Sequence, residues 1–225
     1  MATLLAEDVL LLLLDDSGAF VAGDNRKLAL AGAVLAELAL IGAVEVETEK
    51  GLWKRSRVVV EDPSTVADPV LTEALDDIAA KKRSAQDLVN RLGKNLSDQL
   101  CARLVDHGLV RRVESKVFGL FPRTRWPVAD SRYVQTLRAS LRRALVDGED
   151  PDQRTACVIA VLSAIDVVPQ VVDRGPLSKR ELNNRAKQIA EGNWASEAVR
   201  KALQATQAAM VAAVTASTVA ATSGT

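Results

Sequence analysis

The stretch KNLSDQLCARLVDHGLVRRVESKVFGLFPRTR, residues 94–125, contains the pattern that decides the fold and the candidate site. Its first half places apolar residues three or four positions apart, at Leu96, Leu100, Cys101, Leu104 and Val105. This spacing gives a helix one apolar face, and Gly108 supplies the left-handed conformation that commonly ends a helix. The pattern therefore predicts an amphipathic helix that begins after Gly93 and ends at His107.

The second half of the stretch predicts a β-hairpin with an apolar tip. Two extended runs, 109–113 and 116–121, can pair, and Pro122 is expected to end the second one. The apolar side chains of the tip are Val117, Phe118, Leu120 and Phe121. Basic side chains flank the tip on both sides, and we call this set the basic collar: Arg111, Arg112, Lys116, Arg123 and Arg125. An apolar tip within a basic collar is typical of a protein that contacts an anionic membrane.

The order helix, strand and hairpin is also that of a winged-helix DNA-binding protein. A recognition helix should expose basic side chains, but the exposed positions here are nearly neutral. Arg103 is their only cation, among Ser97, Asp98, Gln99 and Asp106. DNA binding is therefore the alternative function, and a nucleic-acid partner is not the expectation.

Composition favours a helical globular protein. Of the 225 residues, 48% are apolar but only 3% are aromatic, so the core must consist mainly of Leu, Val and Ala. Ala and Leu are strong helix formers. The two cysteines, Cys101 and Cys157, lie on apolar helical faces. This position predicts two buried thiols in a reducing compartment, and no disulfide.

Charge is unevenly distributed along the chain. The whole chain carries 29 basic and 29 acidic side chains, whereas residues 81–143 carry 15 basic and 5 acidic ones. A middle third this basic suggests a polyanionic partner. The alternative is that these charges scatter over several faces and cancel locally.

The sequence also predicts where the protein resides. Residues 1–8 carry acidic side chains and lack the basic segment of a secretory signal. No run reaches the roughly 18 consecutive apolar residues that a membrane span requires. We therefore expect a soluble, cytoplasmic protein whose membrane contact is peripheral.

The remaining pattern predicts a mainly α fold with a few short β-hairpins, in a single domain over residues 1–225 with a frayed end at 218–225. Glu37 is a lone carboxylate on an otherwise apolar helix, and we expect it to pair with an Arg. Helices are expected at 3–14, 24–41, 69–82, 84–92, 130–146, 152–165, 177–191 and 194–218, and a strand pair at 44–47 and 57–60.

No pattern in the sequence indicates catalysis. His107 is the only histidine, and its place at a helix end predicts contact with the terminal carbonyl groups. The chain has no cysteine pair at metal-ligand spacing, no nucleophile elbow and no glycine-rich phosphate loop. We expect no enzyme activity, no metal site and no cofactor.

Four segments, in order, resemble blocks of the Golgi phosphoprotein 3 family: Leu30–Gly42, Asp68–Ile78, Leu104–Leu109 and Arg154–Val168. The resemblance extends from about Leu4 to Thr215, and the composition suits a bacterial, actinobacterial member. It implies a mostly α-helical domain. The eukaryotic members are peripheral membrane proteins that bind phosphatidylinositol-4-phosphate and act as adaptors for glycosyltransferase tails. Their apolar hairpin inserts into the bilayer and can also join protomers.

The resemblance also assigns candidate lipid-binding residues. The family pocket uses a Trp, an Arg and a further pair of Arg three apart, and these positions fall on Ala22, Ala31, Lys94 and Ser97 here. Lys94 alone keeps a positive charge. We therefore expect a broader anionic-lipid surface formed by Lys94, Arg91 and the basic collar. An anionic membrane, an unidentified protein client and a second protomer at residues 117–121 are the expected partners.

Overall fold

The computed structural model describes residues 3–48, 56–81, 83–117, 121–192, 201, 204–212 and 214–215. It confirms the mainly α fold. The α-helices are α1 (Leu5–Leu12), α2 (Asn25–Leu40), α3 (Pro69–Ala80), α4 (Ala85–Asp106), α5 (Ser131–Arg142), α6 (Gln153–Ala164), α7 (Val168–Val171) and α8 (Lys179–Glu191). The other helical turns are the 3-10 turn η1 (Pro63–Thr65) and the π-helical turn η2 (Arg143–Asp147), and residues 204–212 are also helical. The strands are β1 (Val44–Thr48), β2 (Ser56–Val60), β3 (Arg83–Ser84), β4 (Val113–Val117) and β5 (Phe121–Arg125).

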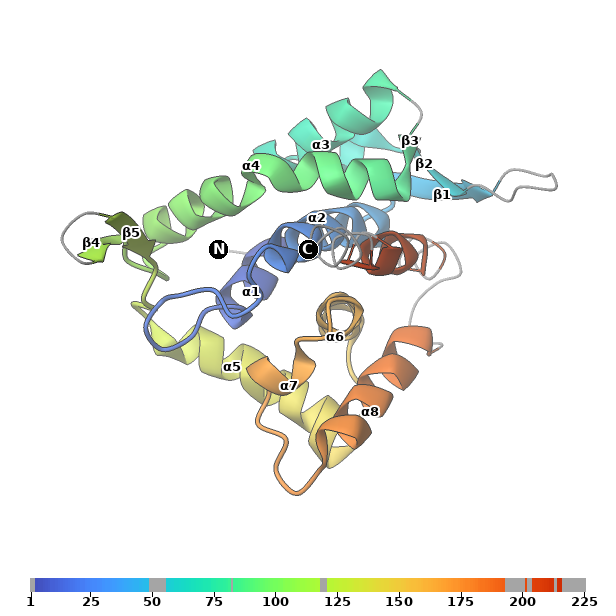
Figure 1. The fold of residues 1–225 in the computed structure, drawn as a ribbon. Helices are drawn as coiled ribbons and strands as arrows, with labels where there is room; N and C mark the ends of the chain where they lie inside the picture. Colours follow the sequence, from blue (N-terminus) through green and yellow to red (C-terminus); the bar gives the residue numbers. More distant parts are fainter. Residues whose placement is uncertain are drawn as a thin grey trace, which may run out of the picture.

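The helices form three tiers (Figure 1). Helices α3 and α4 and the sheet of β1, β2 and β3 lie on one side, α5, α7 and α8 lie on the other, and α1, α2 and α6 lie between them. Every residue of α1 is buried, and the run from Ala156 to Leu162 in α6 is buried as well. These apolar helices form the core, as their sequences predict, and each fully buried Leu contributes about 1.5–3 kcal/mol.

Most helix starts agree with the sequence. Asp68, Ser84, Asp130, Asp152 and Ser178 each accept a backbone N–H in the first turn of the helix that follows. The first helix differs, because α1 begins after Leu4 and its capping carboxylate is that of Glu7. The helix was expected from residue 3, but Thr3 lies outside α1 and donates its hydroxyl to Asp8.

Helix α4 corrects one prediction. The sequence suggested a short helix to Leu92 and a second helix after Gly93, but α4 continues through Gly93. The glycine allows α2 to approach closely, since a Cβ at this position would lie 2.7 Å from the backbone oxygen of Lys27. Gly93 is therefore a contact between helices and does not end a helix.

Replacing Gly93 by Ala is expected to destabilise the protein by about 1–3 kcal/mol, because an added methyl group forces two packed helices apart. Urea unfolding would measure the change. Asn90→Ala is the matched control on the same helix, at an exposed position where Ala improves helix propensity. A Gly93→Ala variant as stable as the Asn90→Ala variant would contradict this account.

The hairpin of residues 113–125 also differs from its prediction. Strands β4 and β5 pair from Val113–Arg125 to Val117–Phe121, about four residues further along the chain than expected. Pro122 lies within β5 opposite Lys116 and does not end the strand. A two-stranded ribbon has an open edge on both sides, so a residue without an N–H is tolerated there. The predicted strand at 109–113 is reduced to a single bridge between Val110 and Val128.

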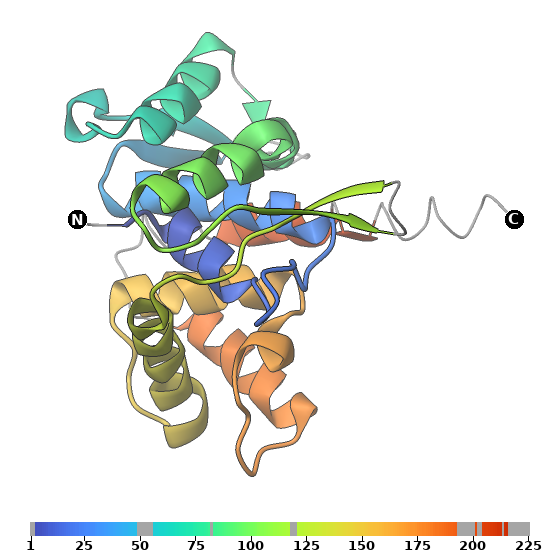
Figure 2. The same ribbon diagram turned by 90° about the vertical axis from the view of Figure 1, so that its left-hand side faces the viewer.

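The loop after α1 holds the base of this ribbon. Trp126 donates its N–H to the carbonyl of Gly18 at 2.8 Å, and Arg125 donates to Ser17. Gly18 has a φ of 75°, and a Cβ there would overlap the backbone of Trp126 and Pro127. The ribbon beyond this anchored base extends away from the helices (Figure 2).

Candidate functional site

The described part of the basic collar surrounds the base and middle of the ribbon. Arg111, Arg112 and Arg123 are exposed, whereas Arg125 is half-buried against Ser17. The Arg112 guanidinium pairs with Glu114 at 2.7 Å and lies 5.9 Å from the centre of the Trp126 ring. Within the described ranges, Arg111 and Arg123 are exposed and form no ion pair.

Two residues of the predicted apolar tip lie at the outer end of the described ribbon. Val117 and Phe121 form its last backbone pair. Phe118 and Leu120 lie outside the described residues, and the side chains of Lys116, Val117 and Phe121 are likewise not described. Val113 on β4 is 44% exposed, which adds an apolar side chain to the ribbon surface within the collar.

The structure separates Arg91 and Lys94 from the collar. Both lie in the first half of α4, and the ribbon follows the other end of this helix (Figure 1). From Lys94 to Asp106 the helix rises about 18 Å. Arg91 pairs with Asp77 at 2.9 Å. The predicted headgroup residues therefore form two groups, and only the collar adjoins the apolar tip.

Two positions that correspond to the family pocket lie on the neighbouring helices α2 and α4. Ala31 is fully buried, and Ser97 on α4 is only 6% exposed. Arg26 approaches Ser97, with its Nε 3.4 Å from the Ser97 Oγ, and stacks 4.9 Å above the centre of the Phe20 ring. Sequence reasoning missed Arg26, although its place at the start of an apolar helix was a usable signal. Its guanidinium lies beside a position where the family has an Arg.

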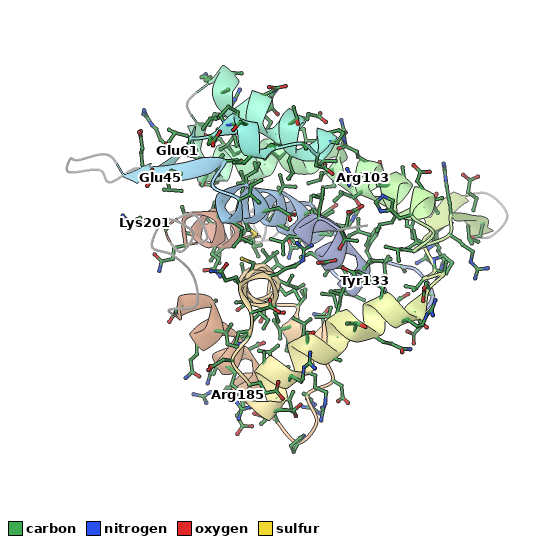
Figure 3. The ribbon with its side chains drawn as sticks, turned by 180° about the vertical axis from the view of Figure 1, so that it is seen from behind. Glu45, Glu61, Arg103, Tyr133, Arg185 and Lys201 are labelled. Atoms are coloured by element: carbon green, nitrogen blue, oxygen red, sulfur yellow. The ribbon has the colours of Figure 1, made fainter. Side chains whose placement is uncertain are left out.

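A network of buried charges connects the elements behind the ribbon. Glu7 and Asp8 on α1 are fully buried. Arg103 on α4 (labelled in Figure 3) lies 3.3 Å from a Glu7 oxygen. It also forms a bidentate ion pair with the Asp68 carboxylate. Arg103 is thus directed into the protein and is engaged by two carboxylates.

Asp8 is the centre of the second half of this network. It accepts hydrogen bonds from Tyr133 at 2.6 Å and from Thr3 at 2.9 Å, and Arg154 lies 2.7 Å from it (Figure 3). Arg154 also contacts Glu37 at 3.2 Å, which confirms that the lone carboxylate of α2 pairs with an Arg. Burial and the bond to Asp8 raise the pKa of Tyr133 to about 12.

His107 differs from its expected role. Its Nδ1 lies 3.6 Å from Glu7, too far for a hydrogen bond, and is buried without a recorded partner in the part of the chain that the structure describes. It faces a carboxylate of α1 and not the terminal carbonyls of α4. This contact adds to the network between α1 and α4.

Burial raises the pKa of Glu37, although the Leu5 N–H and Arg154 oppose the shift. A carboxyl group whose pKa is raised by folding binds its proton more tightly in the folded state. Its contribution to stability is therefore largest below the unfolded pKa near 4.5 and falls as pH rises toward the folded value.

We expect the difference in unfolding free energy between the wild type and Glu37→Gln to shift against the wild type as pH rises above about 4.5. Urea unfolding of both proteins from pH 4 to pH 7 would measure this slope. Glu45→Gln, on the exposed side of β1, provides a control. A difference that grows in favour of the wild type over this range would refute the assignment.

Within the described ranges, no three His, Cys, Asp or Glu side chains gather closely enough to hold a metal ion. None of the helices described is both long enough and apolar enough to cross a membrane. Cys101 and Cys157 are buried and unpaired, as predicted, and desolvation raises the pKa of each thiol to about 12.

A mainly helical body, a projecting ribbon with a basic collar and a buried charge network define the class: a mainly α-helical domain with a projecting two-stranded ribbon. The family model of Golgi phosphoprotein 3 (GPP34) matches residues 5–206. The chain belongs to this family, as the resemblance of its four segments indicated. No protein among the curated sequences compared with it matches the chain.

Proposed function

We propose that this protein binds anionic membranes peripherally through the β4–β5 ribbon and its basic collar. The observation that carries the proposal is the ribbon itself, which extends from the body (Figure 2). Arg123 is exposed on β5, and Arg111 is exposed just before β4. The sequence between the two strands of the ribbon is Phe118-Gly119-Leu120. Aromatic and aliphatic side chains at such a tip favour the boundary between headgroups and acyl chains.

The energies are sufficient for reversible binding. Each basic residue near an anionic surface contributes about 1 kcal/mol. Insertion of Phe118, Leu120 and Phe121 adds about 1.5–3 kcal/mol for each side chain that becomes fully buried. The two contributions together support useful affinity, whereas either alone gives weak binding.

The ligand in this proposal is a broad class of anionic lipids. Phosphatidylinositol-4-phosphate is one member of that class, and family membership suggests it as a ligand. In this chain, the buried Ala31 and Ser97 offer no charge at two family positions, and the nearby charges come from Lys94 and Arg26. Selectivity among anionic headgroups is therefore expected to be lower than that of a site with several forked arginines.

The orientation of Arg103 does not favour DNA binding. This only cation in the second half of α4 is paired with Glu7 and Asp68. A homodimer through residues 117–121 is compatible with membrane binding, because two protomers would present two collars to one surface. An adaptor role toward a protein client rests on family membership alone, and we propose it as the reason for membrane attachment.

Co-sedimentation with vesicles tests the proposal. Neutral vesicles are compared with vesicles that contain phosphatidylglycerol, cardiolipin or phosphatidylinositol-4-phosphate, at low and physiological salt. We expect binding to every anionic mixture and weaker binding at higher salt. Binding to none of the mixtures would refute the function, and binding to phosphatidylinositol-4-phosphate alone would refute the broad surface.

A further inference from the structure

A small cavity lies between α2, α3 and α4, on the far half of α4 from the ribbon. Its volume is about 250 Å³. The buried side chains of Val34, Val70, Ala74 and Leu96 form an apolar floor. This volume is slightly below the roughly 300–1,000 Å³ of pockets for drug-sized ligands. A ligand that fills it must therefore be small.

The two walls of the cavity carry opposite charge. Helix α3 contributes Glu73 and Asp77, one turn apart, and α4 contributes Arg91 and Lys94. The amides of Asn95 and Gln99 continue the α4 wall. Carboxylates therefore face cations and amide groups across an apolar floor.

Contacts between the walls leave one solvent-exposed charge of each sign without an ion pair. Arg91 pairs with Asp77 at 2.9 Å, and Gln99 donates to Glu73 at 3.3 Å. Within the described ranges, Glu73 has no cationic side chain and Lys94 has no carboxylate at ion-pair distance. Because these two groups line one cavity from opposite helices, they match a ligand that carries both charges.

We propose that this cavity binds a small zwitterion, a molecule with a primary ammonium group a few bonds from a phosphate. Glu73 receives the ammonium group, and Lys94 with the Asn95 amide receives the phosphate. The aliphatic atoms between the two charges lie on the apolar floor. Two sources supply this chemistry: free phosphoethanolamine and the headgroup of phosphatidylethanolamine. The proposal does not depend on membrane binding by the collar.

Isothermal titration calorimetry of the full chain tests this assignment. The probes are O-phosphoethanolamine, ethanolamine alone, methyl phosphate alone and a short-chain phosphatidylethanolamine below its micelle concentration. We expect O-phosphoethanolamine to bind at least about tenfold more tightly than either single-charge probe. If short-chain phosphatidylethanolamine binds as tightly as O-phosphoethanolamine, the natural ligand is a lipid headgroup. If the lipid binds much more weakly than O-phosphoethanolamine, the natural ligand is the free metabolite.

Glu73→Gln should weaken O-phosphoethanolamine binding by about tenfold and leave methyl phosphate binding unchanged. Asp76→Asn makes the same charge change at an exposed position of α3 outside the cavity. It should change the affinity for neither O-phosphoethanolamine nor methyl phosphate. Lys94→Met should weaken both probes, and melting temperatures would verify that each variant is folded.

Two results would overturn the zwitterion site: no binding of O-phosphoethanolamine at millimolar concentration, or equal binding of methyl phosphate. Glu73→Gln should also bind anionic vesicles as the wild type does, because Glu73 is not part of the collar. Failure of the cavity proposal is therefore distinguishable from failure of the membrane proposal.

Discussion

Replacement of Arg154 by Met is expected to destabilise the protein by about 3 kcal/mol, since it leaves two carboxylates without their cation. Asp8 is 1% exposed and Glu37 is 12% exposed at the side chain. Arg154 is itself 40% exposed, so water can replace part of its guanidinium, and the expected loss lies at the lower end of the range for broken buried pairs. Chemical denaturation at pH 7 would measure the loss.

Arg132→Met is the matched control, because Arg132 also pairs with a carboxylate but its side chain is 88% exposed. A surface pair of this kind contributes about 0–1 kcal/mol. Acidification should reduce the Arg154→Met defect, because protonation removes the uncompensated charges. Equal effects of the two substitutions would show that the buried network is not important for stability.

Reversal of charge at Arg111 and Arg123 is expected to reduce binding to anionic vesicles by about 30-fold or more. Each basic residue contributes about 1 kcal/mol near such a surface, and reversal replaces attraction with repulsion. These two are chosen because Arg112 is engaged with Glu114 and Arg125 with Ser17. The partition coefficients of wild type and Arg111→Glu/Arg123→Glu, measured at constant salt, give the effect.

Lys179→Glu/Arg180→Glu changes net charge by the same amount on exposed positions of α8, away from the ribbon (Figure 1). If the collar is the contact surface, this control retains most of the binding. A similar loss in both double variants would indicate that net charge alone drives association, and would contradict a specific contact by the ribbon.

Local pattern predicted most of the helices. The apolar runs of α1, α2 and α6 are buried as expected, because a helix that is apolar on nearly every side can be stabilised only in the core. The pairing of Glu37 with an Arg was predictable from the cost of burying a lone charge, but the identity of Arg154 was not. That partner lies 117 positions away along the chain, and only the packing of α6 against α2 brings it there.

The misplaced features depend on distant contacts. Gly93 continues a helix because the backbone of Lys27 leaves no room for a side chain, and nothing near position 93 encodes this. The register of the ribbon depends on the loop at Gly18, which holds Trp126 and extends the pairing to Arg125. The residues of the collar could be identified from their charges in the sequence. Their separation from Arg91 and Lys94 could not, because it results from the continuous length of α4.

The central claim is that the ribbon tip enters an anionic membrane, and a fluorescent probe at position 118 tests it most directly. Cys101 and Cys157 are buried, with pKa values of about 12, so a cysteine introduced by Phe118→Cys can be labelled selectively. We predict a blue shift and increased emission of an environment-sensitive label on anionic vesicles, with no change for a label at Lys179→Cys. Unchanged emission at position 118 while the protein is bound to vesicles would contradict insertion of the ribbon.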